Sequence, residues 1–146
     1  MIKPIIYLIG SLRDSKVPEI GQQLRDAGFE VFDDWHAAGP TADDEWKRYE
    51  EDRGHTYEQA LEGYAAKHVF AFDKHHLLKA DIGVLIMPCG KSGHLELGYM
   101  LGLEGKRGYI LREQGVDRWD CMYQFADGVF ADLKSLIQEL QLVYYD

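Results

Sequence analysis

Glu96 places a carboxylic acid inside an apolar segment of the chain. Its neighbours Leu95 and Leu97 are apolar, and residues 82–87 upstream form an almost unbroken apolar run. Such a run is typical of a strand that is buried on both faces. A carboxylate near the start of a helix that follows a parallel strand lies at the usual ligand crevice of an open α/β sheet. Because an unpartnered buried charge is costly, we interpret Glu96 as the working residue.

A capping role for Glu96 is the alternative. The predicted helix can begin with Ser92 or Gly93 as its N-cap. With Gly93 in that place, Glu96 is the third helical residue, where free amides and the helix dipole favour a carboxylate. The spacing alone leaves both interpretations open.

Three aspartates are candidates to act together with Glu96. Asp33 and Asp34 follow the second predicted strand, and Asp73 lies near the end of a long predicted helix. Two carboxyl groups with separated pKa values suffice for a nucleophile and a general acid at a glycosidic carbon. Each aspartate can equally be a solvated or capping residue.

Residues 90–92 read Gly-Lys-Ser between a predicted strand and a predicted helix, which resembles a phosphate-binding P-loop. That motif requires a glycine five positions before Gly90, where this chain has Leu85, and Pro88 removes a further amide. We therefore exclude a Walker-type NTPase. Ser92, Gly93 and the amides at the start of the helix can still bind a small anion.

The histidines and cysteines do not have metal-ligand spacing. His68, His75 and His76 lie on one predicted helix without an HExxH pattern or a nearby cysteine cluster. We expect them to be core or surface residues, and we expect neither a metal nor another cofactor. Cys89 lies beside the candidate site without an identifiable base, so we expect a small buried thiol.

Composition limits the class of protein. The chain has 146 residues and a net charge of −9, and 46% of its residues are hydrophobic. We expect one domain, residues 1–146, with a real core. The acidic balance argues against nucleic acid as a partner. The chain has no apolar run of membrane-span length, no export signal and only two cysteines, so we expect a cytoplasmic protein without a membrane partner.

Alternating strand and helix patterns predict the fold. Strands are expected at 4–9, 29–32, 82–87, 107–111 and 128–131, and helices at 18–27, 43–53, 56–79, from about 93 to 105, and at 132–142. This alternation predicts a three-layer Rossmann-like (flavodoxin-like) α/β domain with four or five mainly parallel strands.

Two segments have a more specific expected role. Residues 36–55 are an acidic insertion after a strand, which is where lids and specificity loops occur, although a solvated insertion fits as well. The segment 56–79 is predicted to be one helix that packs on the sheet, because apolar and aromatic residues recur at helical spacing. Thr56 and Gln59 form a plausible capping box at its start.

The order of four segments, YLIGSLR, DDW, FDKHHLLKAD and SGHLELGY, carries a family resemblance. Over residues 5–111 the chain resembles the nucleoside 2-deoxyribosyltransferase-like superfamily. Its GSxR and SxHxE arrangements are most similar to the branch of nucleoside 5'-monophosphate N-glycosidases, which includes the CMP hydrolases.

The resemblance implies roles for particular residues. The family's glutamate nucleophile falls on Glu96, and the aspartate that assists at the base falls on Asp73. Its phosphate-binding loop falls on Gly10, Ser11 and Arg13, with Ser92 beside them, and His94 matches a histidine of the same motif. Beyond the resemblance, we take Asp34 as the substitute for Asp73, and Tyr7, Asp33, Trp35 and Gly93 as further substrate-binding candidates.

One position departs from the nucleoside-specific transferases, which have an aspartate where this chain has Ser92. A hydroxyl there favours a 5'-phosphate over a free 5'-hydroxyl, so the resemblance implies hydrolysis of a (deoxy)nucleoside monophosphate in a homo-oligomer. The alternatives are a base-exchanging transferase, a non-catalytic nucleotide sensor, and an enzyme that acts on a dinucleotide such as NAD.

Overall fold

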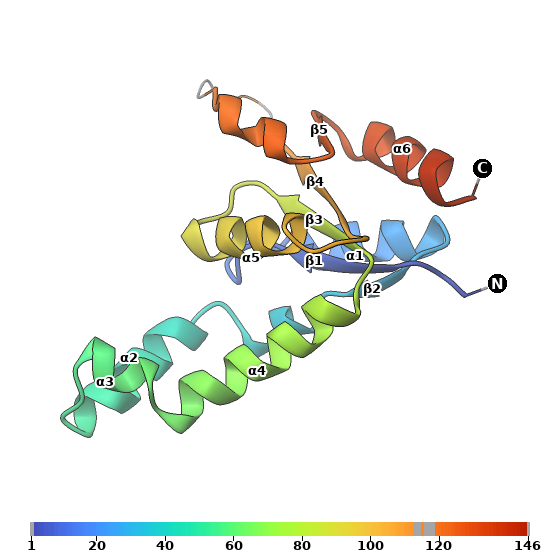
Figure 1. The fold of residues 1–146 in the computed structure, drawn as a ribbon. Helices are drawn as coiled ribbons and strands as arrows, with labels where there is room; N and C mark the ends of the chain where they lie inside the picture. Colours follow the sequence, from blue (N-terminus) through green and yellow to red (C-terminus); the bar gives the residue numbers. More distant parts are fainter. Residues whose placement is uncertain (1, 113–114, 116–118, 146) are drawn as a thin grey trace.

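Five parallel strands form the centre of the protein in a computed structural model that describes residues 2–112, 115 and 119–145. Their order is β2-β1-β3-β4-β5 (Figure 1). The strands are β1 (Ile5–Ile9), β2 (Glu30–Phe32), β3 (Ile82–Ile86), β4 (Arg107–Leu111) and β5 (Gly128–Phe130). This is the flavodoxin-like order, and the predicted α/β fold is confirmed.

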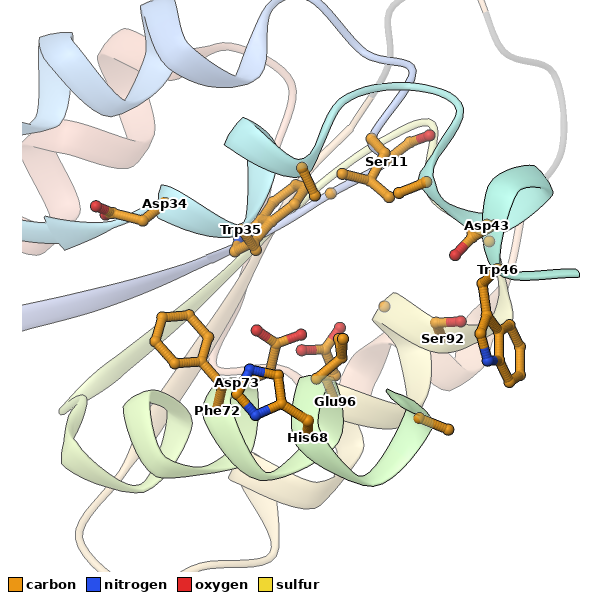
Figure 2. A pocket seen from close by; sticks show the side chains of 18 of the residues that line it. Ser11, Asp34, Trp35, Asp43, Trp46, His68, Phe72, Asp73, Ser92 and Glu96 are labelled. Atoms are coloured by element: carbon orange, nitrogen blue, oxygen red, sulfur yellow. The ribbon is translucent and has the colours of Figure 1, made fainter. Parts of the chain in front are cut away.

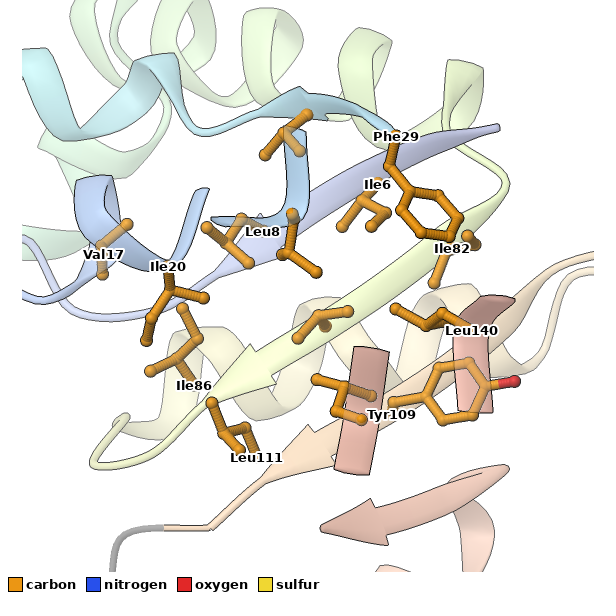
Figure 3. Close-up of a cluster of buried hydrophobic side chains, with 14 residues drawn as sticks. Ile6, Leu8, Val17, Ile20, Phe29, Ile82, Ile86, Tyr109, Leu111 and Leu140 are labelled. Carbon is orange, nitrogen blue, oxygen red and sulfur yellow. The ribbon is translucent and has the colours of Figure 1, made fainter. Parts of the chain in front are cut away.

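Helices cover both faces of the sheet. One face packs against α1 (Val17–Asp26) and α6 (Leu133–Tyr145), which supply Val17, Leu24 and Leu136 to a buried cluster with the strands (Figure 3). The other face packs against α5 (Lys91–Leu101) and the end of α4 (Tyr64–Lys79), through Leu97 and Leu77. The domain therefore has the three layers that the alternating sequence pattern predicts.

β1 and β3 are the central strands, and both are buried along almost their whole length. They pair in parallel from Ile6 opposite Ile82 to Ile9 opposite Leu85. Parallel strands buried on both faces require continuous apolar runs, which is why these two strands are recognisable in the sequence. Their carboxyl ends lie at the same edge of the sheet, and both continue into loops that reach the candidate site.

The segment 56–79 is two helices and not the single helix that the spacing predicts. α3 (Tyr57–Leu61) begins with the expected capping box of Thr56 and Gln59, and α4 begins anew after Gly63. Leu77 is the only residue of α4 that is fully buried. The prediction that the whole segment packs on the sheet is wrong, because α4 extends past the sheet edge and only its carboxyl-terminal end reaches it (Figure 1).

The insertion after β2 forms an arm, defined here as residues 34–63. It contains the 3-10 helix η1 (Asp34–Ala38), then α2 (Ala42–Asp52) and α3. Glu50 is 4% exposed and accepts a hydrogen bond from His55 Nδ1 at 2.9 Å, which closes the turn between the two α-helices. Figure 1 shows α2 and α3 beside the far end of α4, away from the sheet.

The carboxyl-terminal part contains a second 3-10 helix, η2 (Cys121–Phe125), before β5 and α6. In the described part of the chain, every helix is too short or too polar to cross a membrane.

Candidate functional site

A cleft of about 1010 Å³ opens at the carboxyl ends of β1 and β3. Its walls come from the loops after these strands, from the start of α5, from α4 and from the arm (Figure 2). This is the crevice where open α/β sheets bind their ligands. The lining residues include Tyr7, Ser11, Trp35, Asp73, Ser92 and Glu96, all of which the sequence singled out.

Glu96 does not cap its helix. α5 begins at Lys91 with Gly90 as the N-cap, so the expected caps Ser92 and Gly93 are both helical and Glu96 lies in the second turn. The capping alternative is therefore wrong. Its Oε2 instead accepts a hydrogen bond of 2.6 Å from the hydroxyl of Tyr7, a fully buried residue of β1.

Burial and charge set the protonation of this pair. The pKa of Glu96 is raised to about 6: burial raises it most, the hydrogen bond from Tyr7 lowers it, and the negative charge of Asp73 raises it. Burial and the negative charge of Glu96 raise the pKa of Tyr7 well above its ordinary value, so the hydroxyl keeps its proton and remains a donor. Glu96 is therefore ionised at neutral pH, held by one oxygen, and directed into the cleft (Figure 2).

Asp73 supplies the second carboxyl group. It comes from α4, and Figure 2 shows it beside Glu96 in the same part of the cleft. Burial raises its pKa. Two neighbouring carboxyl groups in a low-dielectric cleft cannot both ionise freely, which is the arrangement that separates an acid from a nucleophile.

Aromatic side chains stand around the carboxyl pair. The indole of Trp35 donates to the carbonyl of Leu8 at 2.7 Å, and this bond fixes the ring at the end of β1. Phe72 lines the cleft from α4 and contacts the stacked pair Phe32–His76, whose ring centroids are 4.1 Å apart. These rings give the cleft planar apolar walls.

Small residues bring two loops close together at the cleft floor. A Cβ on Gly93 would lie 2.1 Å from Cys89 Sγ, and a Cβ on Gly10 would lie 3.1 Å from a methyl group of Val17. Ser11 accepts a hydrogen bond from the backbone amide of Arg13. A Cβ on Gly93 would also lie 3.0 Å from a methyl group of Ile9, so the end of β1 lies close to the first turn of α5, where Ser92 and the free amides of the helix lie.

Arg13 lies outside the cleft, in a neighbouring groove of about 490 Å³ that Lys16 also lines. Ser11, Cys89 and Gly90 line both cavities. The guanidinium of Arg13 contacts the carboxylate of Asp44 in the arm at 3.2 Å, and both side chains are exposed.

Two of the expected binding residues are engaged elsewhere. Asp33 forms an ion pair of 2.6 Å with Arg25 of α1 and does not line the cleft. His94 also does not line it, because its Nδ1 donates to the carbonyl of Gly90 and its Nε2 contacts the hydroxyl of Tyr123. Both side chains are therefore held by partners outside the cleft. Asp34 lines the cleft, but Figure 2 shows its carboxylate directed away from Glu96.

The cleft has further lining residues beyond the named site candidates. Asp43, Trp46 and Tyr49 of α2 and His68 of α4 all line the cleft. Trp46 and Tyr49 lie on one side of a short predicted helix. An aromatic side of this kind indicates a surface that packs against another element or lines a site. His68, expected to be a core or surface residue, faces the cleft (Figure 2). Cys89, expected to be a buried thiol, is half-buried, and burial raises the pKa of its thiol.

In the described ranges, no group of histidine, cysteine, aspartate or glutamate side chains is arranged to hold a metal ion. Comparison of the chain with models of protein families and with curated proteins found no match.

Proposed function

We propose that this protein is an N-glycosidase that cleaves the bond between base and sugar in a (deoxy)nucleoside 5'-monophosphate. The observation that carries the proposal is the buried carboxylate of Glu96, fixed by Tyr7 and adjacent to the second acid, Asp73. A covalent mechanism at an anomeric carbon requires a nucleophilic carboxylate and a second group that assists the leaving base.

In the proposed reaction, Glu96 Oε1 attacks C1' while the glycosidic bond loosens through an oxocarbenium-like state. Tyr7 holds Oε2 and so orients the attacking oxygen. Asp73, whose pKa burial raises, is the proposed general acid that donates a proton to the departing base. Water then hydrolyses the glycosyl ester and regenerates Glu96.

The 5'-phosphate binds where the cleft meets the neighbouring groove. Ser11, Ser92 and the free amides at the start of α5 are the donors, and a helix of this length favours an anion at its amino end. Arg13 reaches the phosphate from the groove after leaving Asp44. Trp35 and Phe72 hold the base.

The test is a chromatographic measurement of free base released from nucleosides, nucleoside monophosphates and NAD. We expect release from monophosphates by the natural protein and none by the Glu96→Gln variant. An equally active Glu96→Gln variant would rule out this nucleophile. Tight nucleotide binding without release would instead support the non-catalytic sensor.

Base exchange is the second candidate function. The cleft volume of about 1010 Å³ leaves room for an incoming base after the first has moved away from C1'. Incubation of a monophosphate with a different, isotopically labelled base distinguishes the two functions. Label in the nucleotide pool supports transfer, and sugar phosphate alone supports hydrolysis.

We also propose that the protein forms a homo-oligomer in the cytoplasm. The side chains of Phe70, Leu95 and Tyr99 are 47–75% exposed on α4 and α5. Lys74 joins the two helices, because its Nζ lies 5.8 Å from the ring centroids of both Phe70 and Tyr99. This α4–α5 face is apolar and basic, which complements the acidic α2 of a second copy.

Sedimentation velocity tests the oligomer. We expect a dimer or larger species for the natural protein and a monomer for Leu95→Asp. Trp119→Asp, at an 89% exposed site outside the α4–α5 face, is the matched control and should remain associated. A monomeric natural protein would contradict the proposed oligomer and would not affect the glycosidase proposal.

A further inference from the structure

The cleft and the groove beside it carry opposite charges. Five acidic residues line the cleft: Asp34, Asp43, Glu45, Asp73 and Glu96. Figure 2 shows the carboxylates of Asp43, Asp73 and Glu96 directed into it. Within the described ranges, no lysine or arginine lines the cleft, and His68 is its only side chain that can become cationic. Arg13 and Lys16 line the groove instead.

The cleft also has planar aromatic walls. Trp35 and Phe72 stand near the carboxyl pair, and Trp46 lines the cleft from the arm. An aromatic face attracts a cation through its quadrupole, and the attraction is larger at a desolvated site. Aromatic rings and carboxylates together therefore suit a flat cation better than an anion.

We infer that the preferred substrate is a nucleotide whose leaving base is a cationic heterocycle, such as an N-glycosylpyridinium or an N-alkylated purine. The inference rests on the proposed glycosidase function and specifies its substrate class. The anionic phosphate lies toward Arg13 and Lys16, the sugar lies at Glu96, and the positive ring lies among the carboxylates and aromatic walls. The substrate and the site then match in charge at both ends.

A cationic base needs no proton to leave. As Glu96 Oε1 forms its bond to C1', the electron pair of the C1'–N bond moves onto the ring nitrogen and neutralises the ring. The first step therefore converts a cation and a carboxylate into a neutral base and a neutral glycosyl ester. Water then adds to C1', Glu96 leaves as a carboxylate, and one proton is released to solvent.

For this substrate class Asp73 acts through its negative charge and not as an acid. When both are ionised, Asp73 and Glu96 repel each other, and a positive ring between them offsets both that repulsion and the cost of burying the two charges. A neutral base leaves this repulsion uncompensated. The charge of the ring is therefore the property that the cleft can distinguish.

The test compares two ligands that differ by one atom in the ring. Nicotinamide mononucleotide carries a cationic pyridinium, and benzamide riboside 5'-phosphate has the same size, sugar and phosphate but a neutral phenyl ring. Both are titrated by calorimetry into full-length Glu96→Gln, which prevents turnover. We expect the cationic ligand to bind at least about tenfold more tightly, the size of one desolvated cation–π contact.

A second comparison assigns the preference to the cleft. Adding Asp73→Asn to Glu96→Gln should reduce the ratio of the two affinities to about threefold or less, whereas adding Glu104→Gln should preserve it, because Glu104 is exposed and outside the cleft. Circular dichroism verifies that each variant is folded. Base release from nicotinamide mononucleotide by the natural protein provides a measurement that does not depend on the variants.

The outcomes separate the inference from the proposed function. Equal affinities, or tighter binding of the neutral ligand, would overturn the inference, while base release from neutral nucleoside monophosphates would leave the proposed function intact. Binding of neither ligand, with no base released from any nucleotide, would overturn both.

Discussion

The hydroxyl of Tyr7 donates to Glu96 Oε2 at 2.6 Å, across a sequence separation of 89 residues. The bond joins the central strand β1 to the second turn of α5, so two elements of the buried core fix the position of one carboxylate. Side chains on regular elements are positioned more accurately than side chains on loops. The proposed nucleophile is therefore held from two regular elements and not from a loop.

Tyr7→Phe tests the function of this bond. The hydrogen bond lowers the pKa of Glu96, so its loss should move the pH midpoint of activity upward from about 6. The base-release rate at neutral pH should fall by about ten- to a hundredfold, because the attacking oxygen is less well oriented. Tyr145→Phe, which loses a hydrogen bond to Gly28 far from the cleft, is the control. An unchanged pH profile would contradict the orienting role.

Glu96→Gln should stabilise the protein at neutral pH. Burial raises the pKa of Glu96 from 4.5 to about 6 in the folded state, so the folded state binds more protons than the unfolded state between these values. The free energy of unfolding therefore falls as pH rises through this window, and the ionised carboxylate destabilises the fold by about 2 kcal/mol at pH 7. Urea unfolding at pH 7 should show this gain.

The same gain should vanish near pH 4, where Glu96 is protonated in both states. Glu104→Gln removes an exposed carboxylate and should change the unfolding free energy by little at either pH. A gain that persists at pH 4 would mean that the substitution acts through packing and not through charge.

Arg13→Ala should impair monophosphates more than nucleosides. The proposed phosphate contact is absent from a nucleoside, so kcat/KM for the monophosphate should fall by about tenfold or more while the value for the nucleoside changes little. Arg48→Ala, on the exposed part of α2, is the control. Equal losses on both substrates would remove the phosphate assignment.

Gly93→Ala should be strongly destabilising. The new methyl group would lie 2.1 Å from Cys89 Sγ and 3.0 Å from a methyl group of Ile9, and overpacking of this kind costs about 1–3 kcal/mol. Adding Cys89→Ala should recover part of the loss, since it removes the closest clash. Thermal unfolding of the single and double variants measures both effects, and the absence of any recovery would contradict this packing.

The sequence predicts the elements that are simple in physical terms. The strands β1 and β3 are buried on both faces, so their continuous apolar runs identify them. A periodic helix pattern is less informative, because it states that one face is covered and not what covers it. In α4 that face includes His68 and Phe72, which line a cleft, while the core receives only Leu77.

Sequence spacing does not show which of several neighbouring polar residues lines the cleft. Asp33 and Asp34 are adjacent, yet Asp33 pairs with Arg25 and only Asp34 lines the cleft. His94 lies one turn before Leu97 on the same helix as Glu96 but contacts Gly90 and Tyr123. These outcomes depend on the directions of individual side chains and on partners distant in sequence, which local spacing does not encode.

The ion pair between Arg13 and Asp44 gives the arm a dependence on ligand. Exposed pairs of this kind contribute at most about 1 kcal/mol, so a phosphate dianion in the groove can displace Asp44 with little cost. Once Arg13 has exchanged partners, α2 loses its ion pair with the loop after β1, while His36 of the arm keeps its contact with the carbonyl of Asp14 in that loop. A single guanidinium therefore links the occupant of the groove to the amino-terminal end of α2.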